Sequence, residues 1–325
     1  MNNGSKYARK KISYVARWLL YQIHTLFLFT CSDFKTIVVP STIFGFFNSL
    51  AAGAYGLGAN TPFSTDILLN RLPRTLLWVS LVFIPFSINN QRTPSAIQED
   101  EINKPWRPIP QRRITPLQAQ CVMWGFAALV QIHGLISNGI GHRQSTFLLV
   151  LDIWYNNFGG ADNNPAIRNG INALGYLCFI SGALEVALWE ILPFPFQNPL
   201  GKTRPEFQLM QWLLIIAGII FTTVHLQDLY DQKGDAVRDR HTMPLVFGDG
   251  PARWTIAVPM IVWGAVCPLF WKVSTGLFRF SLTLAYIVAV RVLTIRDEAG
   301  DRATFRVWNC WIATIYIMPL FSHLS

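Results

Sequence analysis

Long apolar runs recur along the whole chain and constrain its fold more than any other feature. Runs of about 18 to 25 residues, each able to cross a hydrocarbon core about 30 Å thick as a helix, alternate with polar stretches. Only 14% of the residues are charged, whereas soluble domains carry roughly 25%. The sequence therefore predicts an all-α, polytopic membrane helical bundle with no room for a separate soluble domain.

We expect about nine transmembrane helices. The expected spans are 36–57, 72–89, 116–137, 145–158, 166–192, 207–227, 251–271, 277–293 and 304–322. The loops after the second, fourth, sixth and eighth spans carry most of the Lys and Arg residues, which places these loops and the N-terminus in the cytoplasm. The formal charge of +9 is spread over these loops without a continuous basic tract. We therefore expect the lipid bilayer as a partner, no nucleic acid, and no obligate protein partner.

The first 35 residues are basic and then mixed in polarity. They lack both the clean apolar region and the small-residue cleavage site of a signal peptide. We expect residues 1–35 to form a basic N-terminal segment with an interfacial helix on the cytoplasmic face, and residues 36–325 to form a single transmembrane domain.

Three carboxylates follow the sixth span. Asp228, Asp231 and Asp235 are spaced three and four residues apart, so a continuing helix would place them on one face, with neighbouring Cβ atoms roughly 5–6 Å apart. Carboxylates at this spacing repel one another unless a cation lies between them, and Mg²⁺ prefers carboxylate oxygens and water. The alternative is a solvated acidic helix end that pairs with the Lys and Arg residues that follow it.

A second charged stretch follows the second span, far upstream. It contains Asn90, Glu99, Asp100, Lys104 and Arg107. Prolines at positions 105, 108 and 110 bar a regular helix and make this loop rigid. Because a guanidinium group presents a forked array of donors, the loop is a candidate to bind a metal-bound phosphate. The alternative is an ordinary solvated loop.

These two stretches resemble the acidic motifs of the UbiA superfamily of intramembrane prenyltransferases. The resemblance rests on N-K-P-W-R-P-I-P after the second span, and on D-x-x-D-x-x-x-D with a later T-x-P after the sixth. It extends over nearly the whole chain and implies one UbiA-like catalytic domain, a bundle around a central cavity open to lipid, capped by cytoplasmic loops. It also implies that Mg²⁺ ions held by two acidic motifs bind the diphosphate of an isoprenoid.

The first motif departs from the family pattern N-x-x-x-D-x-x-x-D. Counting from Asn90, the two Asp positions hold Pro94 and Gln98, and the nearest acids are Glu99 and Asp100. This altered loop resembles that of the fungal UbiA-type terpene cyclases, whereas acceptor prenyltransferases generally keep both Asp residues.

The resemblance, together with the residue chemistry, gives a set of candidate site residues. The expected metal-binding and catalytic residues are Asp228, Asp231, Asp235, Glu99 and Asp100. The expected substrate-binding residues are Asn90, Lys104, Arg107, Arg168, Tyr155, Tyr230 and Lys233. Two further acids, Asp152 and Glu185, fall within spans and would be costly against lipid, so we expect them to face the interior. Glu185 is expected to make a structural hydrogen bond.

The expected activity is that of a Mg²⁺-dependent class I terpene cyclase in the endoplasmic reticulum membrane. Such an enzyme releases diphosphate from an isoprenyl diphosphate, here farnesyl diphosphate, and cyclises the remaining chain to a terpene hydrocarbon. Two alternatives remain open. An aromatic prenyltransferase would pass the same prenyl group to a phenolic acceptor. A transporter would explain the intramembrane charges but not two acidic motifs opening to one face, and the chain shows no internal repeat.

Overall fold

The computed structural model describes residues 3–58, 60–192 and 204–322, and within these ranges it contains helices and turns but no β-strand. The long helices are α1 (Asn3–Asp33), α2 (Val39–Leu50), α3 (Thr65–Arg92), α5 (Pro116–Ile136), α6 (His142–Asn157), α7 (Pro165–Leu188), α8 (Arg204–Thr223), α11 (Asp249–Trp271), α12 (Thr275–Thr294) and α13 (Glu298–Tyr316). The short helices are α4 (Pro94–Asn103), α9 (Asp228–Val237), α10 (Met243–Phe247) and α14 (Met318–Phe321). A π-helical segment η1 (Phe34–Val38) and two 3-10 turns, η2 (Ala52–Tyr55) and η4 (Val224–Gln227), complete the described elements.

The predicted all-α membrane bundle is confirmed, but the count of nine spans is not. Seven helical segments in the described ranges are long and apolar enough to cross a membrane. The helix at the fourth predicted span, α6, has only 16 residues, and α13, at the ninth, begins with several charged residues. The first segment runs from Tyr14 through η1 to Leu50 without interruption. The interfacial placement of residues 1–35 stays a prediction.

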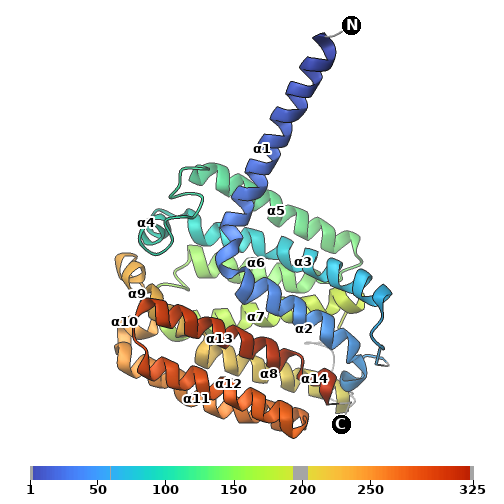
Figure 1. Cartoon of the computed structure of the whole chain (residues 1–325), viewed down its shortest axis with the longest axis vertical. Helices are drawn as coiled ribbons and strands as arrows, with labels where there is room; N and C mark the ends of the chain where they lie inside the picture. Colours follow the sequence, from blue (N-terminus) through green and yellow to red (C-terminus); the bar gives the residue numbers. More distant parts are fainter. Residues whose placement is uncertain (1–2, 59, 193–203, 323–325) are drawn as a thin grey trace.

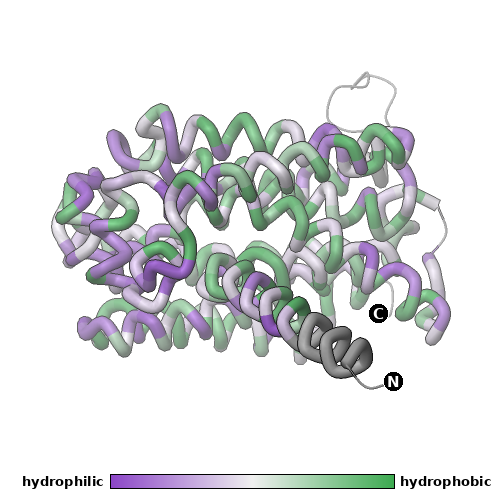
Figure 2. Tube along the Cα trace, turned by 90° about the horizontal axis from the view of Figure 1, so that it is seen from above, coloured by the Kyte–Doolittle hydropathy of each residue, from purple (hydrophilic) through white to green (hydrophobic). Residues whose placement is uncertain are grey.

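The long helices lie side by side around α7, which packs against α2, α3, α6 and α8 (Figure 1). At one end of this bundle the short helices α4, α9 and α10 form a cap, while α1 projects away from it (Figure 1). Hydrophilic residues gather towards the ends of the bundle, with mostly apolar residues between them (Figure 2). This pattern is expected of helices whose middle sections face lipid or one another.

Two glycines allow the central helices to approach closely. A Cβ atom on Gly45 would lie 2.6 Å from the carbonyl carbon of Ala183, where α2 crosses α7. A Cβ atom on Gly182 would lie 2.1 Å from the indole ring of Trp78, which α3 packs onto α7. Small residues are the usual means of tight helix packing in membranes, where dispersion contacts replace the hydrophobic effect. This packing holds α2 and α3 against α7, and α3 and α7 form two walls of the pocket described below.

Glu185 has the structural surroundings that the sequence suggested. Its side chain is fully buried near the end of α7. The carboxylate accepts hydrogen bonds from the backbone N–H groups of Gly141, at 2.9 Å, and Leu192, at 3.1 Å, and it pairs with Arg143. A buried carboxylate with this many donors ties together the turn before α6 and the segment after α7.

Candidate active site

The acidic residues upstream lie on a short helix and not in a loop. α4 begins at Pro94, in the first helical turn, with the hydroxyl of Thr93 accepting from the N–H of Ala96 at 3.4 Å. Proline at the first position after a Thr N-cap is a standard helix start. The helix buries Glu99 and Asp100 and leaves Glu101 exposed. The proline-rich segment from 104 to 115 is irregular, as predicted.

The three downstream carboxylates share the buried face of α9, as their spacing predicted. α8 ends at Thr223, and the 3-10 turn η4 leads directly into α9. Asp228 and Asp235 are 1% exposed, and Asp231 is 9% exposed. The face therefore points into the protein and towards α4, which packs against α9 at the end of the bundle (Figure 1).

One side chain joins the two acidic helices. The amide of Asn103 donates to the carbonyl of Asp231 at 3.0 Å and accepts from the N–H of Gly234 at 3.1 Å. A Cβ atom on Gly234 would lie only 2.2 Å from the Asn103 amide nitrogen. Glycine is therefore required at this position for the last turn of α4 to dock on α9.

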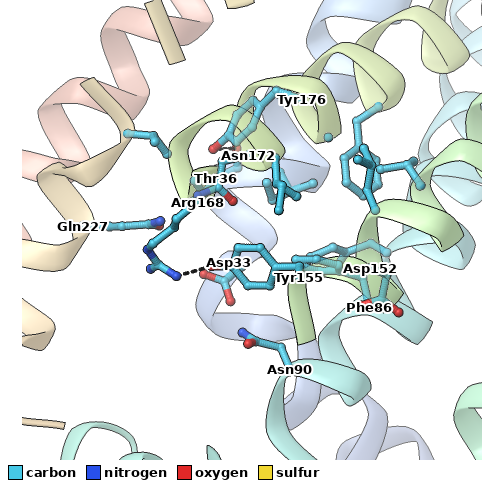
Figure 3. A pocket seen from close by; sticks show the side chains of 18 of the residues that line it. Asp33, Thr36, Phe86, Asn90, Asp152, Tyr155, Arg168, Asn172, Tyr176 and Gln227 are labelled. Carbon is cyan, nitrogen blue, oxygen red and sulfur yellow. Dashed lines mark hydrogen bonds between the residues drawn. The ribbon is translucent and has the colours of Figure 1, made fainter. Parts of the chain in front are cut away.

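A pocket opens beneath this cap, between η1, α3, α6 and α7 (Figure 3). Seven of the predicted site residues line it: Asn90, Glu99, Lys104, Arg107, Tyr155, Arg168 and Asp231. Its apolar wall is formed largely by Phe83, Phe86, Leu148, Leu151, Ile171, Tyr176 and Phe179. The polar lining also includes Asp33, Thr36, Asp152, Asn172, Gln227 and Arg240, which were not among the predicted site residues. The charged residues belong mainly to the cap, and the aromatic residues belong to the helices below it.

Arg168 connects the cap helix α9 with the α6 wall of this pocket. Its Nη2 lies 2.7 Å from Oδ1 of Asp228, and its Nε lies 3.4 Å from Oδ2 of the same carboxylate. The remaining terminal nitrogen, Nη1, donates to the hydroxyl of Tyr155 (Figure 3). Arg168 is 4% exposed, so its charge is fixed at the junction of the cap and the apolar wall.

The second and third α9 carboxylates also have cationic partners. Nζ of Lys104 lies 3.1 Å from Oδ2 of Asp231, and Nη1 of Arg240 lies 3.1 Å from Oδ1 of Asp235. The other oxygen of each carboxylate is buried and has no hydrogen-bond partner. Oδ1 of Asp231 lies 3.7 Å from Nη2 of Arg302 but accepts no hydrogen bond. Carboxylate oxygens of this kind are the donor atoms that a Mg²⁺ ion prefers. Asp231 and Asp235 therefore fit the metal role that was expected of them, whereas both oxygens of Asp228 contact Arg168.

The upstream carboxylates have different surroundings. Oε1 of Glu99 lies 3.0 Å from Arg240, and Oε2 lies 3.1 Å from Arg238. Burial alone would raise the pKa of Glu99, but the charges of Arg240, Lys104 and Arg238 outweigh it and lower the pKa to about 2. Glu99 is thus ionised and bound on both oxygens by guanidinium groups.

Asp100 is held by Arg107 in the same way. Nη1 of Arg107 lies 2.7 and 3.0 Å from the two carboxylate oxygens, and Nη2 donates to the hydroxyl of Ser32 at 3.0 Å. Burial alone would lower the pKa of Arg107, but Asp100 and Asp33 raise it above its usual value. Within the described residues, no three His, Cys, Asp or Glu side chains are grouped as a ready metal site. Metal binding at α4 would therefore require these Arg pairs to open.

Two predicted substrate-binding residues lie away from the main pocket. Lys233 is on the outer side of α9, with its side chain 82% exposed and 3.8 Å from Glu298. Tyr230 packs against Phe305, with ring centroids 5.8 Å apart, and lies under the guanidinium of Arg302. Lys233 is therefore not brought together with the pocket lining. Tyr230 lies in a second pocket, which shares Asp33, Lys104, Gln227 and Asp231 with the main one.

Arg238 and Arg240 are the charged residues whose place in the site the sequence did not indicate. They entered only in the alternative of a solvated acidic helix end, yet each is 7% exposed and joins α4 to the segment after α9. The carboxylate of Asp162, at 3.2 Å from Arg238 and 3.0 Å from Arg240, completes this network. The only signal in the sequence was that both residues come shortly after Asp235. Their shared partner, Glu99, lies 139 or more positions upstream.

Comparison with known proteins agrees with this architecture. The profile of the UbiA prenyltransferase family matches residues 50–311. The fumagillin beta-trans-bergamotene synthase af520 of Aspergillus fumigatus is 29% identical, over 93% of each chain. The polyprenyl transferase eriF of Hericium erinaceus is 30% identical, over 87% of this chain and 88% of the relative.

Two solved structures share the fold at low sequence identity. A digeranylgeranylglyceryl phosphate synthase superposes with a TM-score of 0.59 and 14% identity, over 93% of this chain and 99% of that chain. A UbiA homolog from Archaeoglobus fulgidus bound to DMAPP and Mg²⁺ superposes with a TM-score of 0.53 and 13% identity, over 88% of this chain and 98% of that chain. With its apolar helices and this family match, the chain is an integral multi-pass membrane protein that belongs to the UbiA prenyltransferase family.

Proposed function

We propose that the chain is a membrane-bound class I terpene cyclase, a Mg²⁺-dependent carbon–oxygen lyase acting on farnesyl diphosphate. The observation that carries this proposal is the division of one pocket into a charged cap and an apolar, aromatic wall. The cap suits a diphosphate group, and the wall suits a prenyl chain. The similarity to a bergamotene synthase over almost the whole chain favours cyclisation of that prenyl chain.

In this mechanism, the cap residues bind the leaving diphosphate. Lys104, which is partly buried, and Arg168, which is buried, present positive charge at the pocket, and the side chain of Asn90 lies on α3 opposite Arg168 (Figure 3). Asp231 and Asp235 would hold Mg²⁺, which neutralises negative charge developing on the diphosphate when bound. Arg107 also lines the pocket, and its pairing with Asp100 fixes the cap in the same way as the pairing of Arg168 with Asp228.

The apolar wall acts on the chain that remains. Once the C–O bond breaks, the allylic cation lies among the rings of Phe86, Tyr155 and Phe179 and beside the aliphatic side chains of α6. Aromatic faces stabilise such a cation by about 0.5–2 kcal/mol for each good contact. The wall also excludes water, which would otherwise quench the cation before the chain can close on itself.

A second candidate function is transfer of the prenyl group to an aromatic acceptor, supported by the 30% identity to a polyprenyl transferase. Both activities would use the same cap and differ only in what attacks the cation. The excess of Lys and Arg in the cap loops favours a cytoplasmic orientation for the site. We place the protein in the endoplasmic reticulum membrane.

The test is turnover of purified protein with Mg²⁺ and farnesyl diphosphate alone, with products identified by mass spectrometry. Geranyl and geranylgeranyl diphosphate serve as parallel substrates for chain length. A terpene hydrocarbon is expected. If diphosphate is released only after a phenol is added, the protein is a prenyltransferase. If none of the three substrates turns over under either condition, both assignments are wrong.

A further inference from the structure

One acidic side chain in the pocket has no cationic partner. Asp152 lies on α6, is 3% exposed, and lines the pocket near Phe86 and Tyr155 (Figure 3). The three other acidic residues that line the pocket each pair with Lys or Arg. Among the residues that the structure describes, none forms an ion pair with Asp152; its carboxylate is bound by amide groups instead.

The amide partners hold this carboxylate as a hydrogen-bond acceptor. Nδ2 of Asn156 lies 2.6 Å from Oδ1 of Asp152, and Nδ2 of Asn89 lies 3.0 Å from Oδ2. The orientation of the Asn89 amide is itself fixed, because its oxygen accepts from Nε of Arg92 at 2.8 Å and its nitrogen also donates to Asn157 at 3.0 Å. A carboxylate that receives one N–H donor on each oxygen matches its ionised, acceptor-only form.

This carboxyl group is buried in the apolar part of the pocket. Asp152 precedes Tyr155 by three residues on α6, so it lies about 4.5 Å farther along the helix from the Arg168 contact. Leu148 and Leu151 flank it on the same helix and also line the pocket. A buried carboxylate without a counter-ion destabilises the folded protein. The nearest cation in its network, Arg92, is bound to the far side of Asn89. A positively charged group in the pocket would supply the missing counter-charge.

We propose that Asp152 is a catalytic residue whose ionised carboxylate stabilises positive charge on the prenyl chain after the diphosphate has left. The inference rests on the proposed function, but not on the choice between cyclase and transferase, because both reactions form the same allylic cation. A fixed charge in a dry wall is already oriented when the C–O bond breaks, so no solvent reorganisation is needed. Asp152 thus complements the aromatic rings of the pocket, about one helical turn from the contact between Tyr155 and Arg168.

The test compares the binding of two unreactive analogues of farnesyl diphosphate. One is the thiolodiphosphate, which has an uncharged chain; the other carries a trialkylammonium group in place of a chain carbon near the diphosphate. Affinities are measured by calorimetry in detergent micelles for the wild type, Asp152→Asn and Ser145→Ala. Ser145 is a matched control, since it is a buried polar residue of α6 whose hydroxyl bonds the carbonyl of His142 at 2.9 Å.

We expect Asp152→Asn to weaken binding of the ammonium analogue at least about tenfold, because a charge–charge contact in the pocket is lost. Binding of the thiolodiphosphate should change less than about twofold, and Ser145→Ala should change neither affinity. An equal loss for both analogues, or no loss for the ammonium analogue, would overturn the charge role of Asp152.

Two outcomes remain decisive even if Asp152→Asn fails to fold. The wild type should bind the ammonium analogue at least about tenfold more tightly than the thiolodiphosphate, and equal affinities would refute the inference. If the wild type binds neither analogue, the proposed function fails and the inference fails with it. If the wild type binds the thiolodiphosphate but shows no preference for the ammonium analogue, the role of Asp152 is refuted and the proposed function is not.

Discussion

Replacing Asp100 by Asn separates two roles that the sequence could not distinguish. The sequence suggested that Asp100 binds Mg²⁺, whereas the structure shows its carboxylate clamped by Arg107. The side chains of this pair are 1% and 3% exposed, and the two contacts measure 2.7 and 3.0 Å. If the main role of Asp100 is this ion pair, the substitution leaves the buried guanidinium of Arg107 without its closest counter-charge.

The expected cost follows from that burial. Removing one partner of a buried ion pair generally costs about 3–5 kcal/mol. Arg107 keeps its hydrogen bond to Ser32 at 3.0 Å and its contact with Asp33 at 3.6 Å. The expected loss in free energy of unfolding is therefore near the lower limit, at about 3 kcal/mol. Because both carboxylate oxygens of Asp100 already accept from Arg107, the Mg²⁺ concentration for half-maximal activity should not change.

The assay has two readouts on the same preparation. Thermal unfolding in detergent is followed by the fluorescence of the 12 Trp residues, and activity is titrated with Mg²⁺. Glu101→Gln is the matched control, since Glu101 is the exposed neighbour on α4 and should behave as wild type in both measurements. If Asp100→Asn unfolds at the wild-type temperature but needs more Mg²⁺, Asp100 is a metal ligand and the clamp reasoning is refuted.

Three further predictions concern the joint between α4 and α9. Asp231→Ala should lower turnover roughly a hundredfold or more while leaving membrane insertion intact, because it removes a carboxylate oxygen that accepts no hydrogen bond at the metal position. Near-normal turnover at saturating Mg²⁺ would exclude Asp231 as a ligand. Gly234→Ala should destabilise the protein by about 1–3 kcal/mol, since the new Cβ would lie 2.2 Å from the amide nitrogen of Asn103. Adding Asn103→Ala should recover part of this loss in a thermal melt, and no recovery would contradict the steric cause. The pKa of Glu99 is lowered from 4.5 to about 2, so its contribution to the stability of the folded protein should be complete above about pH 4.5 and decrease as the pH falls towards 2. The unfolding temperatures of Glu99→Gln and wild type should therefore converge in acid, and a constant difference would show that Glu99 does not titrate there.

The positions of the long helices could be predicted from the sequence because each apolar run carries its own information. Length and hydropathy are local properties, and a helix satisfies its backbone hydrogen bonds within the segment. The shared face of Asp228, Asp231 and Asp235 is likewise a consequence of helical periodicity. The same periodicity turns Lys233 about 200° away from Asp231, which explains its exposure. The helix α4 was not predicted, although Thr93 and Pro94 together form a common helix start.

The identity of the ion-pair partners required the folded chain. Arg238 and Arg240 follow an acidic helix and could pair with it locally, but their buried position depends on Glu99, 139 and 141 residues upstream. Asp152 has the residue type of a metal ligand or a structural acid, and only the packing of α6 against α3 places Asn89, and not a cation, beside it. Ion pairing and desolvation depend on distances in space between separate helices, and these distances are set when the helices pack together.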